Sequence, residues 1–263
     1  YAPAIILSSV LGWNIYVTNV IMGGIVILYS ISGGARAVAY TQQLQLAIIF
    51  AGLFLAAFLL LNMLPVGMGF SEAIALGKQM GKMNVITTGI TEEGFDWNDR
   101  FNIFSGVIGG FFLALSYFGT DQSQVGRYLT ASSIRESRIG LIMNGIVKIP
   151  MQYFILLIGV LVFVFYMFNT SPIFFNKMAV DKLKATAYKS EVEKIEADHA
   201  KLSERKKVLL LQWQNGDKKQ LTLELKKISD QEQSNRKKMT TLVKSSGIAI
   251  EQSDTNYIFI RFV

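Results

Sequence analysis

The hydrophobic residues of this chain occur in long blocks that short polar segments separate. From Leu44 to Leu61 only Gln45 is polar, and from Ile149 to Phe168 only Pro150 and Gln152 interrupt the apolar run. Blocks of about 20 apolar residues match a hydrocarbon core of about 30 Å that a helix crosses at 1.5 Å per residue. The pattern therefore predicts an all-α polytopic integral membrane protein.

The same pattern predicts where the segments begin and end. We expect the end of one span at residues 1–10 and further spans at 15–31, 44–64, 102–119 and 139–168. Between them we expect a tight turn at 12–14, a loop at 29–45, a short surface helix at 71–84 and a polar turn at 120–138. Residues 254–263 resemble the start of another span, so we interpret the sequence as a fragment cut in the membrane at both ends.

Residues 176–247 follow a different pattern, with apolar positions three, four and seven residues apart, as in the seam of a coiled coil. A turn at Gly216 would join two helical arms, with Glu232 and Asn235 as polar seam positions that loosen the second arm. We therefore expect three parts: a transmembrane core at 1–169, an extracytoplasmic helical-hairpin insert at 170–253, and the start of the next transmembrane helix at 254–263. The predicted seam comprises Tyr188, Val192, Ile195, His199, Leu202, Leu209 and Trp213, then Leu221, Leu225, Ile228, Met239 and Leu242.

The net charge of +7 lies entirely in this hairpin, because residues 176–247 hold 17 Lys and Arg against 10 Asp and Glu. The membrane part is neutral. Because the excess positive charge is confined to the hairpin of a membrane protein, we expect no nucleic-acid partner. The lysines form a solvated face, contact anionic lipid headgroups or bind a protein partner. His199, the only histidine, has no second ligand near it in the sequence, so we expect a seam residue rather than a metal ligand.

Arginines set the expected orientation. Arg36 lies in one predicted loop, and Arg127, Arg135 and Arg138 lie in another loop on the same side of the membrane. Cytoplasmic loops carry an excess of Lys and Arg, and long loops escape that rule. These loops are therefore expected in the cytoplasm and the basic hairpin outside.

Lys148 is the residue with the clearest chemical signal. It lies inside an apolar span, where an ammonium group costs several kcal/mol unless it faces water, a partner or a ligand. It either snorkels or pairs with a carboxylate of another helix, or it contacts solute in a transport cavity, a possibility that the nearby Pro150 favours. Tyr117 and Ser116 lie near the end of their own span, where an interfacial tyrosine is the simpler alternative.

Two motifs resemble those of the sodium:solute symporter family. "ILYSISGGARAVAYTQQLQ", residues 27–45, resembles the family pattern Tyr-x-x-x-Gly-Gly-x-x-Ala-Val-x-x-Thr-Asp-x-x-Gln. "YFGTDQSQVGRYLTASS", residues 117–133, resembles Gly-Thr-Asp-Gln-x-x-Val-Gln-Arg-x-Leu. The similarity covers residues 1–169 and resumes near Asp254.

The resemblance implies a LeuT-type fold of two inverted repeats, of which this chain holds about core helices 3–7. It implies sodium-coupled uptake of a sugar, an organic acid or a similar solute, with sodium as the coupling ion. The tyrosine matching Tyr117 packs over substrate in sugar-carrying relatives, and the lysine matching Lys148 contacts the sugar. Ser116 is expected beside them, with Asp121, Gln122 and Arg127 as a cytoplasmic gate and Thr41 and Gln42 on the sodium path.

The chain departs from the family pattern at three positions. Gln42 replaces an aspartate, Gly126 replaces a glutamine, and Ala114 stands where sugar carriers often have asparagine. The last change argues against assuming a hexose. The principal sodium site belongs to core helices that this chain lacks, so we assign no metal ligand.

These observations predict a secondary active transporter that works by alternating access. An alternative is a transporter-like membrane sensor whose helical insert binds a partner, and a third is a membrane scaffold without a solute. For Arg127, a purely topological role competes with gating. We expect no enzyme activity, because no nucleophile–base pair or metal cluster occurs. The expected location is the plasma membrane, specifically the inner membrane of a bacterium.

Overall fold

The computed structural model describes residues 2–84, 87–91, 94–97, 102–129, 131, 133–215, 218–247 and 254–262. The chain divides into two compact units, Tyr1–Ala73 with Leu161–Val263 and Ile74–Val160. Its elements are α1 (Ala2–Leu11), α2 (Ile15–Asn62), α3 (Phe70–Gln79), β1 (Ile90–Thr91), β2 (Gly94–Phe95), α4 (Ile103–Gly119), α5 (Gln122–Leu129), α6 (Ile134–Phe168), α7 (Lys177–Lys184), α8 (Lys189–Asn215), α9 (Lys218–Ser245), the 3₁₀ helix η1 (Thr255–Tyr257) and α10 (Ile258–Phe262).

Three segments within the described residues are long and apolar enough to cross a membrane: Ile15–Gly34, Ala37–Asn62 and Ile134–Phe168. Helix α4 is apolar but shorter. Most side chains of these helices are exposed in this chain, and α4 buries none of its described residues. Lipid or other protein must cover that apolar surface, which confirms an all-α, multi-pass membrane protein.

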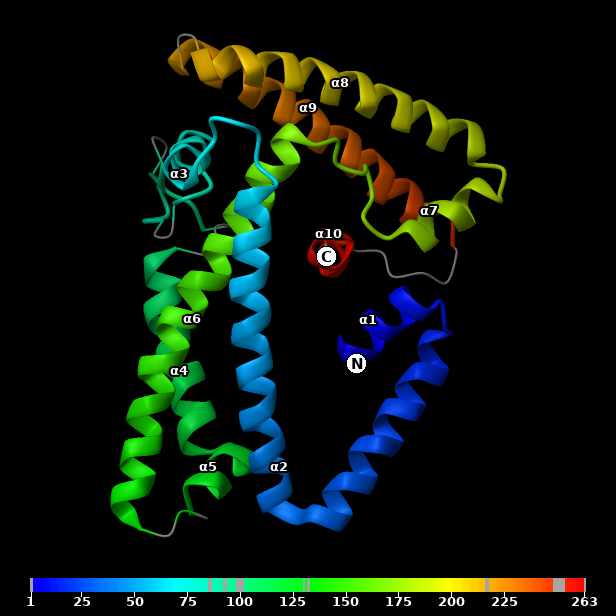
Figure 1. Cartoon of the computed structure of the whole chain (residues 1–263). Coiled ribbons are helices and arrows are strands. Elements are labelled where there is room, and N and C mark those ends of the chain that lie inside the picture. The colour runs from blue at the N-terminus through cyan, green and yellow to red at the C-terminus, as the bar shows by residue number, and fades with distance from the viewer. Residues whose placement is uncertain are drawn as a thin grey trace. The chain divides into compact units, whose positions relative to one another are not determined.

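The loop predicted at 29–45 is wrong. Both flanking spans belong to the single element α2, and within it only Gly34 leaves helical geometry, with φ 58° and ψ −161°. Figure 1 shows the resulting sharp bend in α2. The residues after the glycine pair include Ala37 and Ala39, and alanine favours helix strongly, so the helix resumes at once. The change of direction needs only Gly34, because glycine adopts positive φ without strain. The turn predicted at 12–14 is present, and Asn14 caps α2 by accepting from the Tyr16 N–H at 2.9 Å.

The polar turn predicted at 120–138 contains helix instead. Helix α5 occupies residues 122–129, and α6 begins at Ile134, before the predicted start at residue 139. Ser133 explains the early start, because its Oγ accepts from the Glu136 N–H at 3.2 Å as an N-cap. The helix then continues through Pro150.

The helix predicted at 71–84 is present as α3 but is not a free surface helix. Ala73 and Leu76 are fully buried, and a Cβ added at Gly77 would lie 2.6 Å from Cγ1 of Val160 in α6. The short β1–β2 hairpin that follows is antiparallel, with Ile90 opposite Phe95. Strands of two residues leave no periodic signal in a sequence, so this hairpin was not expected.

Helices α8 and α9 run side by side over their length (Figure 1). Most of the predicted seam is buried, including Val192, Ile195, Trp213, Leu225 and Met239. The turn predicted at Gly216 lies outside the described residues. Leu202 and Leu221 are only half-buried, because their neighbours Ser203 and Thr222 take the seam positions.

Two features of this region differ from the sequence-based expectation. Lys206 is 3 % exposed, so not all lysines lie on a solvated face. Its Nζ lies 2.8 and 2.7 Å from the two carboxylate oxygens of Glu232, which removes the unpaired charge. Helix α7 was also missed, although Asn176 caps it and Ala179, Val180 and Leu183 form a buried face at helical spacing.

Candidate functional site

Tyr117 and Lys148 come together in the unit formed by residues 74–160. Tyr117 lies near the end of α4, and Lys148 lies in the middle of α6. The Lys148 Nζ stands over the Tyr117 ring, 5.3 Å from the ring centroid. A cation at that distance from an aromatic face is attracted by the ring quadrupole, by about 0.5–2 kcal/mol depending on desolvation. The two residues singled out separately in the sequence therefore form one cation–π pair.

The helices place this pair within apolar surroundings. Asn102 begins α4 by accepting from the Ser105 N–H at 2.9 Å, and apart from two serines and one tyrosine the helix consists of apolar residues and glycine. Lys148 lies nine residues beyond Ile139, where the apolar part of α6 begins, or about 14 Å along the helix axis. Lys148 remains solvent-exposed in this chain, and Tyr117 is partly buried. The ammonium group thus has an aromatic face on one side and open space on another.

Ser116 contributes through its backbone. Its carbonyl oxygen accepts from the N–H groups of Thr120 and Asp121, both at 3.0 Å, and from the Thr120 hydroxyl at 2.9 Å. These bonds end α4 at Gly119, two residues after Tyr117, so the ring lies in the last turn of the helix. Among the described residues, the hydroxyl of Ser116 makes no hydrogen bond to Tyr117 or Lys148.

Of the predicted gate residues, Asp121 directly precedes α5, Gln122 begins it and Arg127 lies in its second half. Asp121 caps this helix, because its Oδ1 accepts from the Gln124 N–H at 3.1 Å and its carbonyl accepts from the Val125 N–H at 2.9 Å. Gln122 is the exposed first residue of α5. The side chain of Arg127 lies outside the described residues. The structure therefore gives Asp121 a capping function, and the gating hypothesis stays a prediction.

Thr41 and Gln42 belong to the other unit, on α2. The Thr41 hydroxyl donates to the Val38 carbonyl at 2.9 Å, within its own helix, and Gln42 is exposed. No group of three or more His, Cys, Asp or Glu side chains that could hold a metal ion occurs in the described part of the chain. A role of these two residues on a sodium path stays a prediction.

Sequence reasoning missed one pocket with charged and apolar lining residues in the other unit. It lies beside α7 and α8 and holds about 290 Å³. The signal that could have indicated it is the capped helix α7, which turns two lysines and an aspartate toward the segment that follows α6.

Comparisons with known proteins identify the family of the chain. The sodium:solute symporter family model matches residues 1–190, which includes residues 170–190 of the expected insert. No solved structure matches the chain.

Several characterised proteins are similar to this chain. The human sodium/iodide cotransporter is 27 % identical over 166 residues, 63 % of this chain and 25 % of the relative. The pig sodium/glucose cotransporter 1 is 30 % identical over 186 residues, 63 % of this chain and 27 % of the relative. The human sodium-coupled monocarboxylate transporter 1 is 28 % identical over 150 residues, 55 % of this chain and 22 % of the relative.

The chain spans about a quarter of the length of these relatives. By name, two are sodium cotransporters and the third is a sodium-coupled transporter, and none is an enzyme. The family match covers most of the chain and includes both helices of the cation–π pair. This chain belongs to the sodium:solute symporter family.

Proposed function

We propose that the full-length protein is a sodium-coupled symporter that carries a small organic solute into the cell by alternating access. The observation that carries the proposal is the contact of Lys148 with Tyr117. A lysine more than two helical turns inside an apolar span is costly unless it serves a polar cavity. An aromatic face beside it supplies a surface on which a solute can stack, and the ammonium group supplies three hydrogen-bond donors.

The solute class follows only in outline. The named relatives carry iodide, glucose and monocarboxylates, according to their names. A free ammonium group suits a carboxylate or donates equally to hydroxyl groups. Ala114, in place of the asparagine of many sugar carriers, removes one side chain that would bond a hexose. We therefore propose a sugar, an organic acid or a similar small solute.

The proposed architecture is part of a LeuT-type inverted-repeat bundle, with this chain supplying about core helices 3–7. The kink at Gly34 and the apolar segments on both sides of it fit two consecutive core helices. Helices α7–α9 would form an extracytoplasmic insert, and residues 254–263 would begin the next span. In such folds substrate sites lie near the bilayer midplane where repeats meet. The proposed location is the plasma membrane, in a bacterium the inner membrane.

The direct test is uptake into proteoliposomes that contain the full-length parent protein. Labelled sugars, carboxylates, sialic acid and amino acids would be offered with and without an inward sodium gradient. We expect one class to accumulate only with the gradient and Lys148→Ala to abolish that accumulation.

The matched control is Lys78→Ala, which removes an exposed lysine of α3 in the same unit. Both variants must elute as folded protein by size-exclusion chromatography. Uptake that is equal in the Lys148→Ala and Lys78→Ala variants would remove Lys148 from the solute site. Sodium-independent flux, or none across the panel from folded protein, would contradict the proposed symport.

A further inference from the structure

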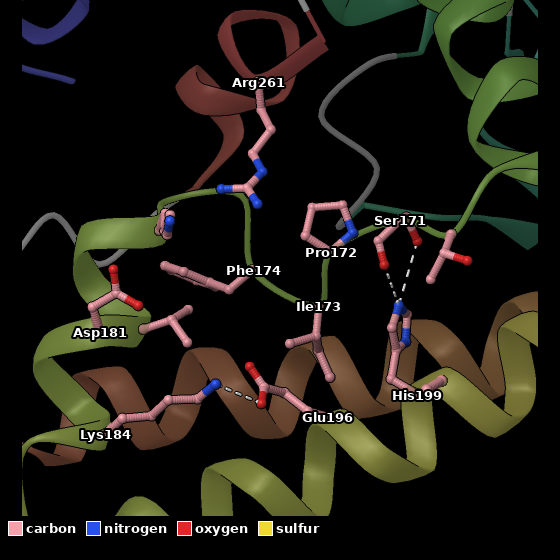
Figure 2. Close-up of a pocket in the computed structure, with 13 residues that line it drawn as sticks. Ser171, Pro172, Ile173, Phe174, Asp181, Lys184, Glu196, His199 and Arg261 are labelled. Atoms are coloured by element: carbon pink, nitrogen blue, oxygen red, sulfur yellow. Dashed lines mark hydrogen bonds and ion pairs between the residues drawn. The ribbon is translucent and has the colours of Figure 1, made fainter. Parts of the chain in front are cut away.

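The pocket beside α7 combines an apolar floor with charged walls. Ile173 and Phe174 form the floor, and both are buried in the hydrophobic cluster shared with α7, α8 and α9. Figure 2 shows Arg261 reaching from α10 over the segment 171–174, while Lys184, Glu196 and His199 lie on the opposite side. Its volume of about 290 Å³ is close to the lower end of the range for small-molecule sites.

The pocket lies where the chain leaves the apolar helix α6. Helix α6 ends at Phe168, and the lining of the pocket starts at Thr170. Aromatic rings pack together where α6 ends. The ring centroids of Phe165 and Phe262 lie 5.2 Å apart and those of Tyr166 and Phe175 lie 5.4 Å apart, both pairs edge to face. Tyrosine is enriched at the boundary between hydrocarbon and water in membrane proteins, and Tyr166 lies in the last turn of α6. We therefore expect the lipid headgroups at the level where α6 ends and the pocket begins.

Two cations of the pocket are available to a ligand. Lys184 is held by Glu196, with Nζ 2.8 Å from the carboxylate. Lys177 and Arg261 are exposed, and within the described residues neither has an ion-pair partner. Asp181 is the remaining acidic group of the lining. The pocket thus keeps a net positive charge when His199 is neutral.

The walls of the pocket are fixed by long-range contacts. The Asp254 carboxylate accepts from the Arg236 guanidinium at 2.8 Å and from the Phe175 backbone N–H at 2.9 Å. The Arg236 guanidinium also lies 5.0 Å from the centre of the Phe175 ring. Asp254 precedes the element that carries Arg261, so this cluster ties α9 and the segment after α6 to the region of α10. These contacts therefore hold the backbone that leads to Lys177 close to the start of the segment that leads to Arg261.

We propose that this pocket binds the phosphate group of an anionic phospholipid. The exposed groups of Lys177 and Arg261 contact the phosphate, and the apolar surface of Pro172, Ile173 and Val180 supports the adjoining glycerol. Arg is suited to phosphate because its planar fork donates two parallel hydrogen bonds. The site would tie the α7–α9 region to the outer leaflet, independently of which solute the protein carries.

The test measures lipid binding to the full-length parent protein in a neutral detergent by native mass spectrometry. The ligands are short-chain phosphatidylglycerol, short-chain phosphatidylcholine and inorganic phosphate. We expect a saturable adduct with phosphatidylglycerol, weaker binding of phosphatidylcholine and weak competition by inorganic phosphate. The double variant K177Q/R261Q should weaken the phosphatidylglycerol adduct roughly 30-fold, the effect of two cations near an anionic headgroup.

The control is K194Q/K201Q, which removes two exposed lysines of α8 outside the pocket. It should change the phosphatidylglycerol adduct by less than about threefold, because surface charges act weakly. Equal losses in the two double variants would overturn the proposal, since they would show diffuse attraction to the basic hairpin. Inorganic phosphate that binds as tightly as phosphatidylglycerol would overturn the lipid as the ligand. A normal thermal unfolding midpoint for each variant excludes misfolding as the cause.

Discussion

The ammonium nitrogen of Lys148 lies 5.3 Å from the centre of the Tyr117 ring and joins α4 to α6. If the ring face holds the ammonium in place for solute, Tyr117→Phe should keep uptake within about threefold, because phenylalanine retains the face. Tyr117→Leu removes the face and should weaken apparent solute affinity about 2- to 30-fold. Initial rates of sodium-driven uptake into proteoliposomes, measured with the solute identified by the panel, give both values.

Phe112→Leu is the control, since it removes an exposed ring of the same helix that packs against Phe111 and not against Lys148. An equal effect of Phe112→Leu and Tyr117→Leu would mean that general packing of α4 against its surroundings matters, and not the pair. A strong loss in Tyr117→Phe would instead assign the function to the phenolic hydroxyl.

Much of the fold could be predicted because apolar length is a strong signal. A run such as 44–64 has few alternatives to a membrane helix. The break at Gly34 could not be separated from a loop, because a glycine pair beside an arginine fits both. The helix-forming residues on each side keep α2 helical up to Gly34 and beyond it. The prediction gave more weight to the glycine pair and the arginine than to these residues.

The sequence indicated which residues belong to the candidate site, but not that Lys148 and Tyr117 lie in contact. Lys148 is conspicuous as an intramembrane charge, and Tyr117 belongs to a long motif. Their contact depends on how α4 and α6 approach each other, which periodicity does not contain. Lys206 shows the same limit, since its burial depends on Glu232 in the other arm. The spacing of apolar residues along one helix therefore could not identify Lys206 as a buried position.

Removing one partner of the buried Lys206–Glu232 pair should lower the stability of the α8–α9 pair strongly, whereas replacing both partners by apolar residues should change it little. Glu232→Leu leaves the Lys206 ammonium without its partner and should destabilise the α8–α9 pair by about 3–5 kcal/mol. The double variant K206M/E232L replaces both charges by apolar groups and should lie close to the parent protein. Hydrogen exchange of α8 and α9 amides in the full-length protein would report the difference as a loss of protection.

Glu204→Gln is the surface comparison, because Glu204 pairs with Lys207 at 3.0 Å and its side chain is 70 % exposed. Its effect should stay below about 1 kcal/mol. If K206M/E232L is as unstable as Glu232→Leu, packing of the polar layer with Ser203 contributes more than charge neutralisation does.

The α8–α9 pair should lose stability in mild acid because of His199. Burial lowers the pKa of His199 below its ordinary value, more than the opposing Glu232 charge and the Ser171 carbonyl raise it. Its Nε2 lies 3.0 Å from that carbonyl, while Lys206 and Arg236 disfavour a further positive charge. As the pH falls below about 6.5, the unfolded chain takes up a proton that the folded one rejects. Stability is therefore full above that pH and declines below it, until the pH reaches the lowered pKa.

Hydrogen exchange at pH 7.5 and 5.5, corrected for the intrinsic exchange rate, measures this decline. Protection of α8 and α9 should fall by up to about tenfold per pH unit below 6.5. His199→Gln keeps a donor for the Ser171 carbonyl and does not titrate, so its protection should be flat over this interval. An equal decline in the parent and in His199→Gln would assign the effect to other groups.

The bend of α2 at Gly34 should depend on the backbone alone. Its φ of 58° and ψ of −161° lie in a region that only glycine adopts readily, and a Cβ added there meets nothing within 4 Å. Gly34→Ala should therefore cost about 1–3 kcal/mol without a steric clash and lower the thermal midpoint of the full-length protein by several degrees. Gly34→Asn should be no better than alanine, because asparagine tolerates the left-handed helical region and not this value of ψ.

Gly24→Ala is the matched control within the regular part of the same element, also with open space around the added methyl, and should be neutral or stabilising. A midpoint for Gly34→Ala equal to that of Gly24→Ala would mean that α2 reaches its change of direction by another backbone geometry.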